Sequence, residues 1–197
     1  MKLFMSKDPL KWGELDLPLL GIGSDWSGKP LLPPLAFSLA ADAENLWFVA
    51  TRQAEACVHP DAFLGSFTPE LWKYDTAELF IADDKTGRYL EFNLAPNGAW
   101  WAAEFSSPRV ASVTQPDFKS NVTSHSGDES GQWLAALSIP LAFLRDTVDF
   151  GTGTKANATF ILGSPEQTFH SAAKLPGAEP DFHQPSAFPI LSTYPIP

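Results

Sequence analysis

The chain has 197 residues and a mass of 21.5 kDa, which is enough to bury a proper hydrophobic core. Charged residues make up only 18% and hydrophobic residues 44%, which argues against intrinsic disorder. The formal net charge of −10 would repel a phosphate backbone, so nucleic acid is not an expected partner. The single cysteine, Cys57, excludes an internal disulfide and a cysteine-rich zinc module.

The N-terminal part of the chain is expected to carry neither a membrane anchor nor a signal peptide. No apolar run approaches the roughly 20 residues needed to cross a bilayer, so no membrane association is expected. Residues 1–18 contain lysines but no apolar segment of a signal peptide, which leaves a cytoplasmic location as the default expectation. We expect one domain over 1–197, with a loop-like segment at 1–23 and loop-like character up to residue 34.

Short strands separated by turn residues are predicted for the rest of the chain. Aromatic residues at 13% and 18 prolines favour strands over helices, and one short helix is predicted at 141–145, after Pro140. The polar stretches 115–131 and 175–189 are predicted to be surface loops. The pattern predicts an all-β fold, an antiparallel β-sandwich of jelly-roll type with at most one or two short helices. The predicted strands are 35–41, 45–52, 76–83, 88–95, 99–105, 132–139, 156–163 and 168–173.

The middle of the chain predicts a three-strand meander with defined registers. A four-residue turn at 84–87 places Leu79 opposite Phe92, and by the same register Ile81 opposite Leu90. A two-residue turn at Asn97-Gly98 would place Leu94 opposite Trp101 and Phe92 opposite Ala103. Both registers pair apolar with apolar side chains, so Leu79, Phe92 and Trp101 are the predicted centre of the inner face.

The other face of this meander is predicted to mix carboxylates with aromatic side chains. Three carboxylates could form an acid/base set or a cation site, or they could lie on a solvated outer face, where alternate polar residues are usual. The neighbouring aromatic side chains, with Trp72 close by, suit a sugar, because sugar rings stack on aromatic faces and hydroxyl groups bond to polar side chains. The face carries Glu78, Phe80, Tyr89, Glu91, Asn93, Trp100 and Glu104.

Common catalytic and metal-binding motifs are absent from the sequence. The four histidines form no HxH or HExxH pattern, and there is no GxSxG, GxxxxGK[ST] or GxGxxG motif. His183 could lie in a pocket or be a hydrogen-bonded loop histidine. Asp83-Asp84 with Gly87 could bind calcium, but a hairpin turn is the favoured interpretation because the acidic spacing of an EF-hand is missing.

Several segments, taken in order, resemble one known family. The segment WKYDTAELF at 72–80 looks like the W-x-x-D-x-x-E-[IVL]-F segment of the carbohydrate-binding module family 9-like domains, a branch of the DOMON-like β-sandwiches. Further similar pieces are 37–48, GRYLEF at 87–92 with Asn97-Gly98, Trp133 with Pro140-Leu141, Phe160 with Gly163, and DFHQP at 181–185. The resemblance spans roughly residues 24 to 191.

This resemblance implies a sugar-binding β-sandwich. In sugar-binding members two tryptophans sandwich the sugar, and charged and amide side chains bind its hydroxyl groups. Trp72 corresponds to one tryptophan and Glu78 to a hydrogen-bonding glutamate. No tryptophan follows Trp133, so the second one expected near the C-terminal end is missing, and Glu91 lies near the place of an expected arginine.

Four functions remain as hypotheses. The first is a non-catalytic module that binds a mono- or oligosaccharide, and the alternative is the same fold used as a protein- or domain-interaction module without sugar. A stand-alone enzyme and a haem-binding DOMON domain follow, and the latter lacks a core methionine ligand. No cofactor is expected, although Arg88, Arg109 or a structural calcium ion could neutralise the carboxylates. The predicted ligand-binding residues are Trp72, Glu78, Glu91, Asn93, Trp100, Arg109 and His183, and the sequence does not define the oligomeric state.

Overall fold

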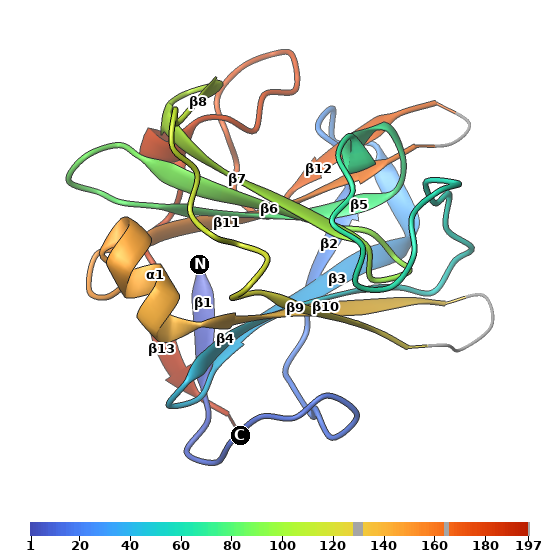
Figure 1. Ribbon diagram of the computed structural model, residues 1–197. Helices are drawn as coiled ribbons and strands as arrows, with labels where there is room; N and C mark the ends of the chain where they lie inside the picture. Colours follow the sequence, from blue (N-terminus) through green and yellow to red (C-terminus); the bar gives the residue numbers. More distant parts are fainter. Residues whose placement is uncertain (128–131, 164–165, 197) are drawn as a thin grey trace.

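The structure is a computed structural model that describes residues 1–127, 132–163 and 166–196. Two β-sheets face each other, and the helix α1 (Leu141–Val148) lies at one end between them (Figure 1). None of the helices in the described residues is long and apolar enough to cross a membrane. The all-β sandwich expected from the sequence is therefore confirmed, with a single short α-helix in the described part of the chain.

Among the described residues, the first sheet contains seven strands and the second contains six. In the first sheet the order is β13-β1-β3-β4-β10-β9, with β2 paired to β3; in the second it is β12-β11-β5-β6-β7-β8. The strands of the first sheet are β1 (Lys2–Met5), β2 (Leu20–Ser24), β3 (Pro30–Ala41), β4 (Asn45–Arg52), β9 (Thr123–Ser126), β10 (Trp133–Pro140) and β13 (Ser192–Pro195). Those of the second sheet are β5 (Thr76–Ala82), β6 (Tyr89–Leu94), β7 (Trp100–Ser107), β8 (Val110–Ala111), β11 (Lys155–Leu162) and β12 (Thr168–Ser171).

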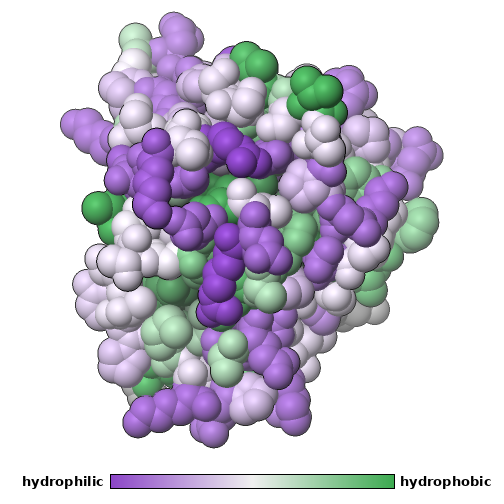
Figure 2. Space-filling view, turned by 60° about the vertical axis from the view of Figure 1, so that its left-hand side comes forward, coloured by the Kyte–Doolittle hydropathy of each residue, from purple (hydrophilic) through white to green (hydrophobic). Residues whose placement is uncertain are grey.

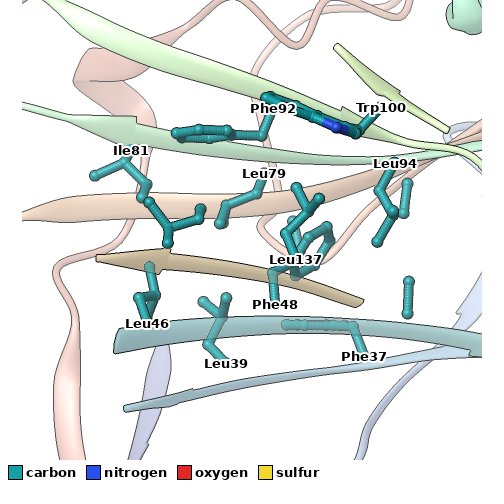
Figure 3. Packing of buried hydrophobic residues seen from close by; sticks show 14 of the residues in the cluster. Phe37, Leu39, Leu46, Phe48, Leu79, Ile81, Phe92, Leu94, Trp100 and Leu137 are labelled. Atoms are coloured by element: carbon teal, nitrogen blue, oxygen red, sulfur yellow. The ribbon is translucent and has the colours of Figure 1, made fainter. Parts of the chain in front are cut away.

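The core lies between the two sheets. Alternate residues of each strand point inward, so large apolar side chains of both sheets meet in one cluster. Figure 3 shows Phe92 and Trp100 of the second sheet above Leu39 and Phe48 of the first. On the face in Figure 2, hydrophobic residues appear in small groups among hydrophilic ones, as expected when most large apolar side chains are inside.

The expectation of a loop-like N-terminal segment over 1–23 is wrong at two places. β1 pairs in parallel with β3 and β13, and β2 pairs antiparallel with β3. β1 has four residues and β2 reads LGIGS, so neither shows the alternating pattern that identifies a strand, and their neighbours in the fold decide their conformation. For the same reason β3 begins at residue 30 rather than 35, and β9 lies within the predicted loop 115–131, of which residues 128–131 lie outside the described residues.

In the meander of β5, β6 and β7, the β5–β6 register agrees with the prediction, and the β6–β7 register differs from it by one residue. The predicted pairing of Leu79 with Phe92 is confirmed, as is the four-residue turn at 84–87. At the second turn, however, the Ala95 N–H donates to the Ala99 carbonyl at 2.8 Å, so the loop contains Pro96, Asn97 and Gly98. Gly98 takes φ +80°, which fits a three-residue hairpin that ends on a left-handed residue.

This extra loop residue exchanges the two faces of β7. Trp100 lies opposite Leu94 and is buried in the core at 3% exposure, whereas Trp101 lies opposite Asn93 on the outer face. The predicted assignment of Trp100 to the polar face and of Trp101 to the core is therefore wrong. Glu104 lies opposite Leu90 and pairs with Arg88, so it does not join the other two glutamates.

Candidate functional site

A cavity of about 440 Å³ opens on the outer face of the second sheet. Its floor comes from β5, β6, β7 and β11, and its walls come from the η1 turn (Leu71–Lys73), β12 and the segment that precedes the η2 turn (Pro185–Ala187). The volume lies in the range of small-molecule sites. The cavity is lined by Trp72, Glu78, Glu91, Trp101, Phe105, Arg109, Ile161, Phe169, Pro180, Phe182 and His183.

Two carboxylates lie in the floor of this pocket. Glu78 lies opposite Asn93 on β6, and Glu91 lies opposite Phe80 on β5, so both point to the same face from neighbouring strands. They are 4% and 6% exposed, respectively. Glu78 Oε2 accepts a hydrogen bond of 2.8 Å from the Thr159 hydroxyl, and Glu91 Oε1 accepts one of 2.6 Å from Asn93 Nδ2. Each carboxyl group is thus held by one neighbour on its own sheet.

Burial changes the proton affinity of both carboxyl groups. It raises the pKa of Glu78 to about 8, because desolvation and the nearby Glu91 charge disfavour the ionised form. It raises the pKa of Glu91 to about 7, chiefly through desolvation and against the hydrogen bond from Asn93. The positive charge of Arg109 lowers the pKa of both groups in part. Near neutral pH the floor can therefore exchange protons with a ligand.

Trp72 forms a wall of the pocket and is 48% exposed, so part of its ring surface is available to a ligand. The η1 turn that carries it is anchored from the side by Asp75. The Asp75 carboxylate accepts hydrogen bonds from the backbone N–H groups of Cys57 at 3.1 Å and Gly163 at 2.7 Å. A Cβ at Gly163 would lie 2.8 Å from the Tyr74 Cα, so only glycine allows this close approach. The position of Trp72 is thus set by backbone packing.

The rim of the pocket is a hydrogen-bonded group around His183. The Arg109 backbone takes φ +62°, and its N–H donates to the Tyr89 hydroxyl oxygen at 3.1 Å. The Arg109 guanidinium donates to Asp181 Oδ1 at 2.8 Å, and the same oxygen accepts from the His183 backbone N–H at 3.0 Å. Desolvation lowers the pKa of His183 to about 4, with a further contribution from Arg109, so its ring is neutral at neutral pH.

The structure brings five of the seven predicted site residues to the cavity: Trp72, Glu78, Glu91, Arg109 and His183. Asn93 is 1% exposed and is not part of the cavity lining, but its side-chain amide donates a hydrogen bond to Glu91. Trp100 is not part of this cavity, because the shifted register turns it into the core. Sequence reasoning missed the remaining lining residues, and Pro96 before Asn97-Gly98 was the signal that could have placed Trp101 here. The missed residues are Trp101, Phe105, Ile161, Phe169, Pro180 and Phe182.

The Asp83 turn acts as a hairpin connection. The Asp83 carboxylate accepts hydrogen bonds from the Lys85 backbone N–H at 2.9 Å and from the Thr86 hydroxyl at 2.6 Å. These bonds occupy both carboxylate oxygens, in the manner of an Asx turn. Within residues 1–127, 132–163 and 166–196 there is no group of three histidine, cysteine or acidic side chains that could hold a metal ion.

Sequence comparison gives one partial relative. No protein-family model matches the chain. The UPF0462 protein C4orf33 homolog of Mus musculus is 28% identical over 130 residues, which is 62% of this chain and 63% of the mouse protein. The match thus spans less than two thirds of the length of that relative.

Structural comparison covers nearly the whole chain. A Bacteroides uniformis protein proposed to bind carbohydrate superposes with a TM-score of 0.71 at 16% identity and covers 98% of both chains. A family 9 carbohydrate-binding module of Caldicellulosiruptor kristjanssonii, in complex with cellotriose, gives 0.64 at 12% identity over 98% of this chain and 93% of that one. The glucose complex gives 0.62 at 13% identity over 99% and 96%.

Proposed function

Because the chain has the fold of the family 9 carbohydrate-binding modules, we propose that it is a non-catalytic carbohydrate-binding domain whose ligand occupies the pocket of Trp72, Glu78 and Glu91. The observation that carries this proposal is the combination of aromatic walls with a carboxylate floor in one cavity. Aromatic faces take up the C–H-rich faces of a sugar ring, and carboxylates accept hydrogen bonds from its hydroxyl groups.

Trp101 supports the proposal, because it supplies a second tryptophan to the pocket. It reaches the cavity from β7, while Trp72 reaches it from η1. Phe169 and Phe182 add further aromatic surface, and their ring centroids are 6.1 Å apart. The pocket therefore has the aromatic area for a sugar ring, although no tryptophan follows Trp133 in the sequence.

The polar groups of the pocket suit hydroxyl recognition as well. Glu78 Oε1 and Glu91 Oε2 lie on side chains that line the cavity, and neither oxygen takes part in a hydrogen bond with the described residues. A carboxyl oxygen can accept a hydrogen bond from a sugar hydroxyl whether or not the group is ionised. Two such acceptors from adjacent strands could bind neighbouring hydroxyl groups of one ring.

Titration calorimetry with simple sugars and oligosaccharides tests this function. Trp72→Ala should nearly abolish binding and Glu78→Gln should weaken it, both with an unchanged circular dichroism spectrum. Phe63→Ala is a matched control, since Phe63 is an aromatic side chain 68% exposed and outside the cavity. Unchanged affinity in both pocket variants would move the site elsewhere, and failure of the wild-type protein to bind any sugar would favour a role in protein interaction.

A further inference from the structure

The pocket holds more carboxyl groups than its own cation can balance when both of them ionise. The carboxyl groups of Glu78 and Glu91 are nine-tenths or more buried, and each has one oxygen without a hydrogen-bond donor among the described residues. His183 Nε2 lies 3.8 Å from Glu91 Oε2, beyond hydrogen-bond distance. A buried carboxylate without full compensation is costly, so these two oxygens favour either a proton or a positively charged partner.

The cation whose charge acts on both carboxyl groups already forms an ion pair with another residue. The Arg109 guanidinium, whose charge acts on both carboxyl groups, pairs with Asp181 at 2.8 Å. His183 contributes no charge at neutral pH, because its pKa is lowered. At the outer wall, Lys73 lies 5.4 Å from the centre of the Trp72 ring and pairs with Glu70 at 2.7 Å. None of these groups donates a hydrogen bond to the two open carboxylate oxygens.

The side chains that line the cavity indicate which kind of cation could bind there. Calcium takes six to eight oxygen ligands, whereas most of this cavity is lined by aromatic and aliphatic side chains. The described residues also bring no third acidic side chain or histidine into a metal-binding group. Aromatic faces do attract an organic ammonium group, and the attraction grows when water is excluded. An ammonium group carries three donors, which fit the two open carboxylate oxygens.

We propose that the pocket takes a sugar bearing a free ammonium group, such as an amino sugar, in preference to the corresponding neutral sugar. This inference rests on the proposed function, since the aromatic walls would hold the ring. The ammonium group would lie against Glu78 and Glu91 and take the place of the protons that these groups hold in the empty pocket. A neutral sugar offers no positive charge to replace those protons, so the two carboxyl groups would keep them.

Proton release distinguishes the two kinds of ligand. A bound ammonium group favours the ionised carboxylates, so binding of an amino sugar should release protons and should strengthen from pH 5 to pH 7. The facing groups are Glu78 of β5, Tyr89 and Glu91 of β6, and Arg109, Asp181 and His183 of the rim. His183 takes little part in this proton release between pH 5 and pH 7, because its pKa is lowered to about 4 and its ring is largely neutral in that range.

Calorimetry with glucose, glucosamine and N-acetylglucosamine at pH 7 tests the inference. We expect glucosamine to bind at least about tenfold more tightly than glucose, and N-acetylglucosamine, which has the substituent without the charge, to show no such gain. Titrations in two buffers of different ionisation enthalpy should reveal proton release with glucosamine only. Glu78→Gln and Glu91→Gln should each reduce the preference to within about twofold, whereas Glu70→Gln, an exposed carboxylate beside Trp72, should preserve it.

The outcomes separate the two proposals. Equal affinity for glucose and glucosamine would overturn the preference and leave sugar binding intact. Tight binding of N-acetylglucosamine as well as glucosamine would also overturn it, because the substituent rather than its charge would then be recognised. Binding of none of the three sugars would overturn the preference, and the oligosaccharide titrations described above would then decide the proposed function by themselves. If one glutamine variant fails to fold, as seen by circular dichroism, the other still tests the preference.

Discussion

The Tyr89 hydroxyl and His183 Nδ1 lie 2.7 Å apart, and this bond sets the proton position on the histidine ring. The Arg109 backbone N–H already donates to the Tyr89 oxygen, so the Tyr89 proton is free to go to Nδ1. The neutral ring then carries its own proton on Nε2, the atom 3.8 Å from Glu91 Oε2. A tyrosine behind the pocket thereby orients a donor toward the carboxylate in its floor.

Removal of this hydroxyl should cost stability. Tyr89→Phe deprives both the Arg109 N–H and His183 Nδ1 of their partner, and we expect a loss of about 1–3 kcal/mol in the free energy of unfolding. Denaturant unfolding measures the loss, and Tyr194→Phe, on an exposed tyrosine, should change it by less than about 0.5 kcal/mol. A Tyr89→Phe protein as stable as wild type would contradict the assigned bonds.

The two neighbouring tryptophans of β7 should behave in opposite ways. Trp100 is buried in the core, so Trp100→Ala should cost about 3–5 kcal/mol of unfolding free energy. Trp101 lines the pocket and is only partly buried, so Trp101→Ala should cost much less stability and should weaken ligand binding strongly. Thermal unfolding and calorimetry on the same two variants check this, and the reverse ranking would show that the β6–β7 register is the two-residue one.

Stability should fall as the pH rises from 6.5 to 8. The pKa values of Glu78 and Glu91, about 8 and 7, lie above their unfolded values, so the folded protein holds more protons in this range. Their stabilising contribution is complete below the unfolded pKa and disappears as the pH passes the folded pKa. Above pH 6.5 the opposite contribution of His183 is already complete. Denaturant unfolding should show a flatter pH dependence for Glu78→Gln than for wild type; identical slopes would reject the raised pKa.

Gly163 should tolerate no side chain. In Gly163→Ala the new Cβ would meet the Tyr74 backbone at 2.8 Å and 3.0 Å, so the segment that carries Trp72 must shift. We expect a loss of about 1–3 kcal/mol in unfolding free energy together with weaker ligand binding. Gly151→Ala is the control, because no atom lies within 4 Å of its added Cβ and its φ is not positive. Equal stability of the two variants would show that the Asp75–Gly163 contact does not position η1.

The sequence predicted the strands that alternate clearly and missed those that do not. β6 could be assigned because Leu90, Phe92 and Leu94 alternate with polar residues, and its register with β5 follows from a turn of four polar or glycine residues. β1 is four residues long and gains its pairing from β3 and β13, which are distant in the chain, whereas β9 is a four-residue strand of polar side chains beside β10. Such pairing leaves no local pattern to recognise.

The candidate site was predicted in part because it combines local and distant segments. Glu78 and Glu91 lie on strands joined by a short turn, so their common face could be derived. Trp101 was missed through a single miscounted turn residue, Pro96, and the miscount also placed Glu104 on the wrong face. Phe169 and Phe182 reach the pocket through β12 and a long connection, and no pattern in the sequence relates them to Glu78.

The alternation along β7 has a consequence for how the domain could diversify. Trp100 and Ala102 face the interior, while Trp101 and Phe105 face the cavity from the same strand. Side chains of the second set can therefore be exchanged without disturbing the packing between the sheets. Descendants or engineered versions of this scaffold could acquire new ligand preferences through a few outward positions, whereas insertion or deletion of one residue in the 96–98 loop would exchange both sets at once.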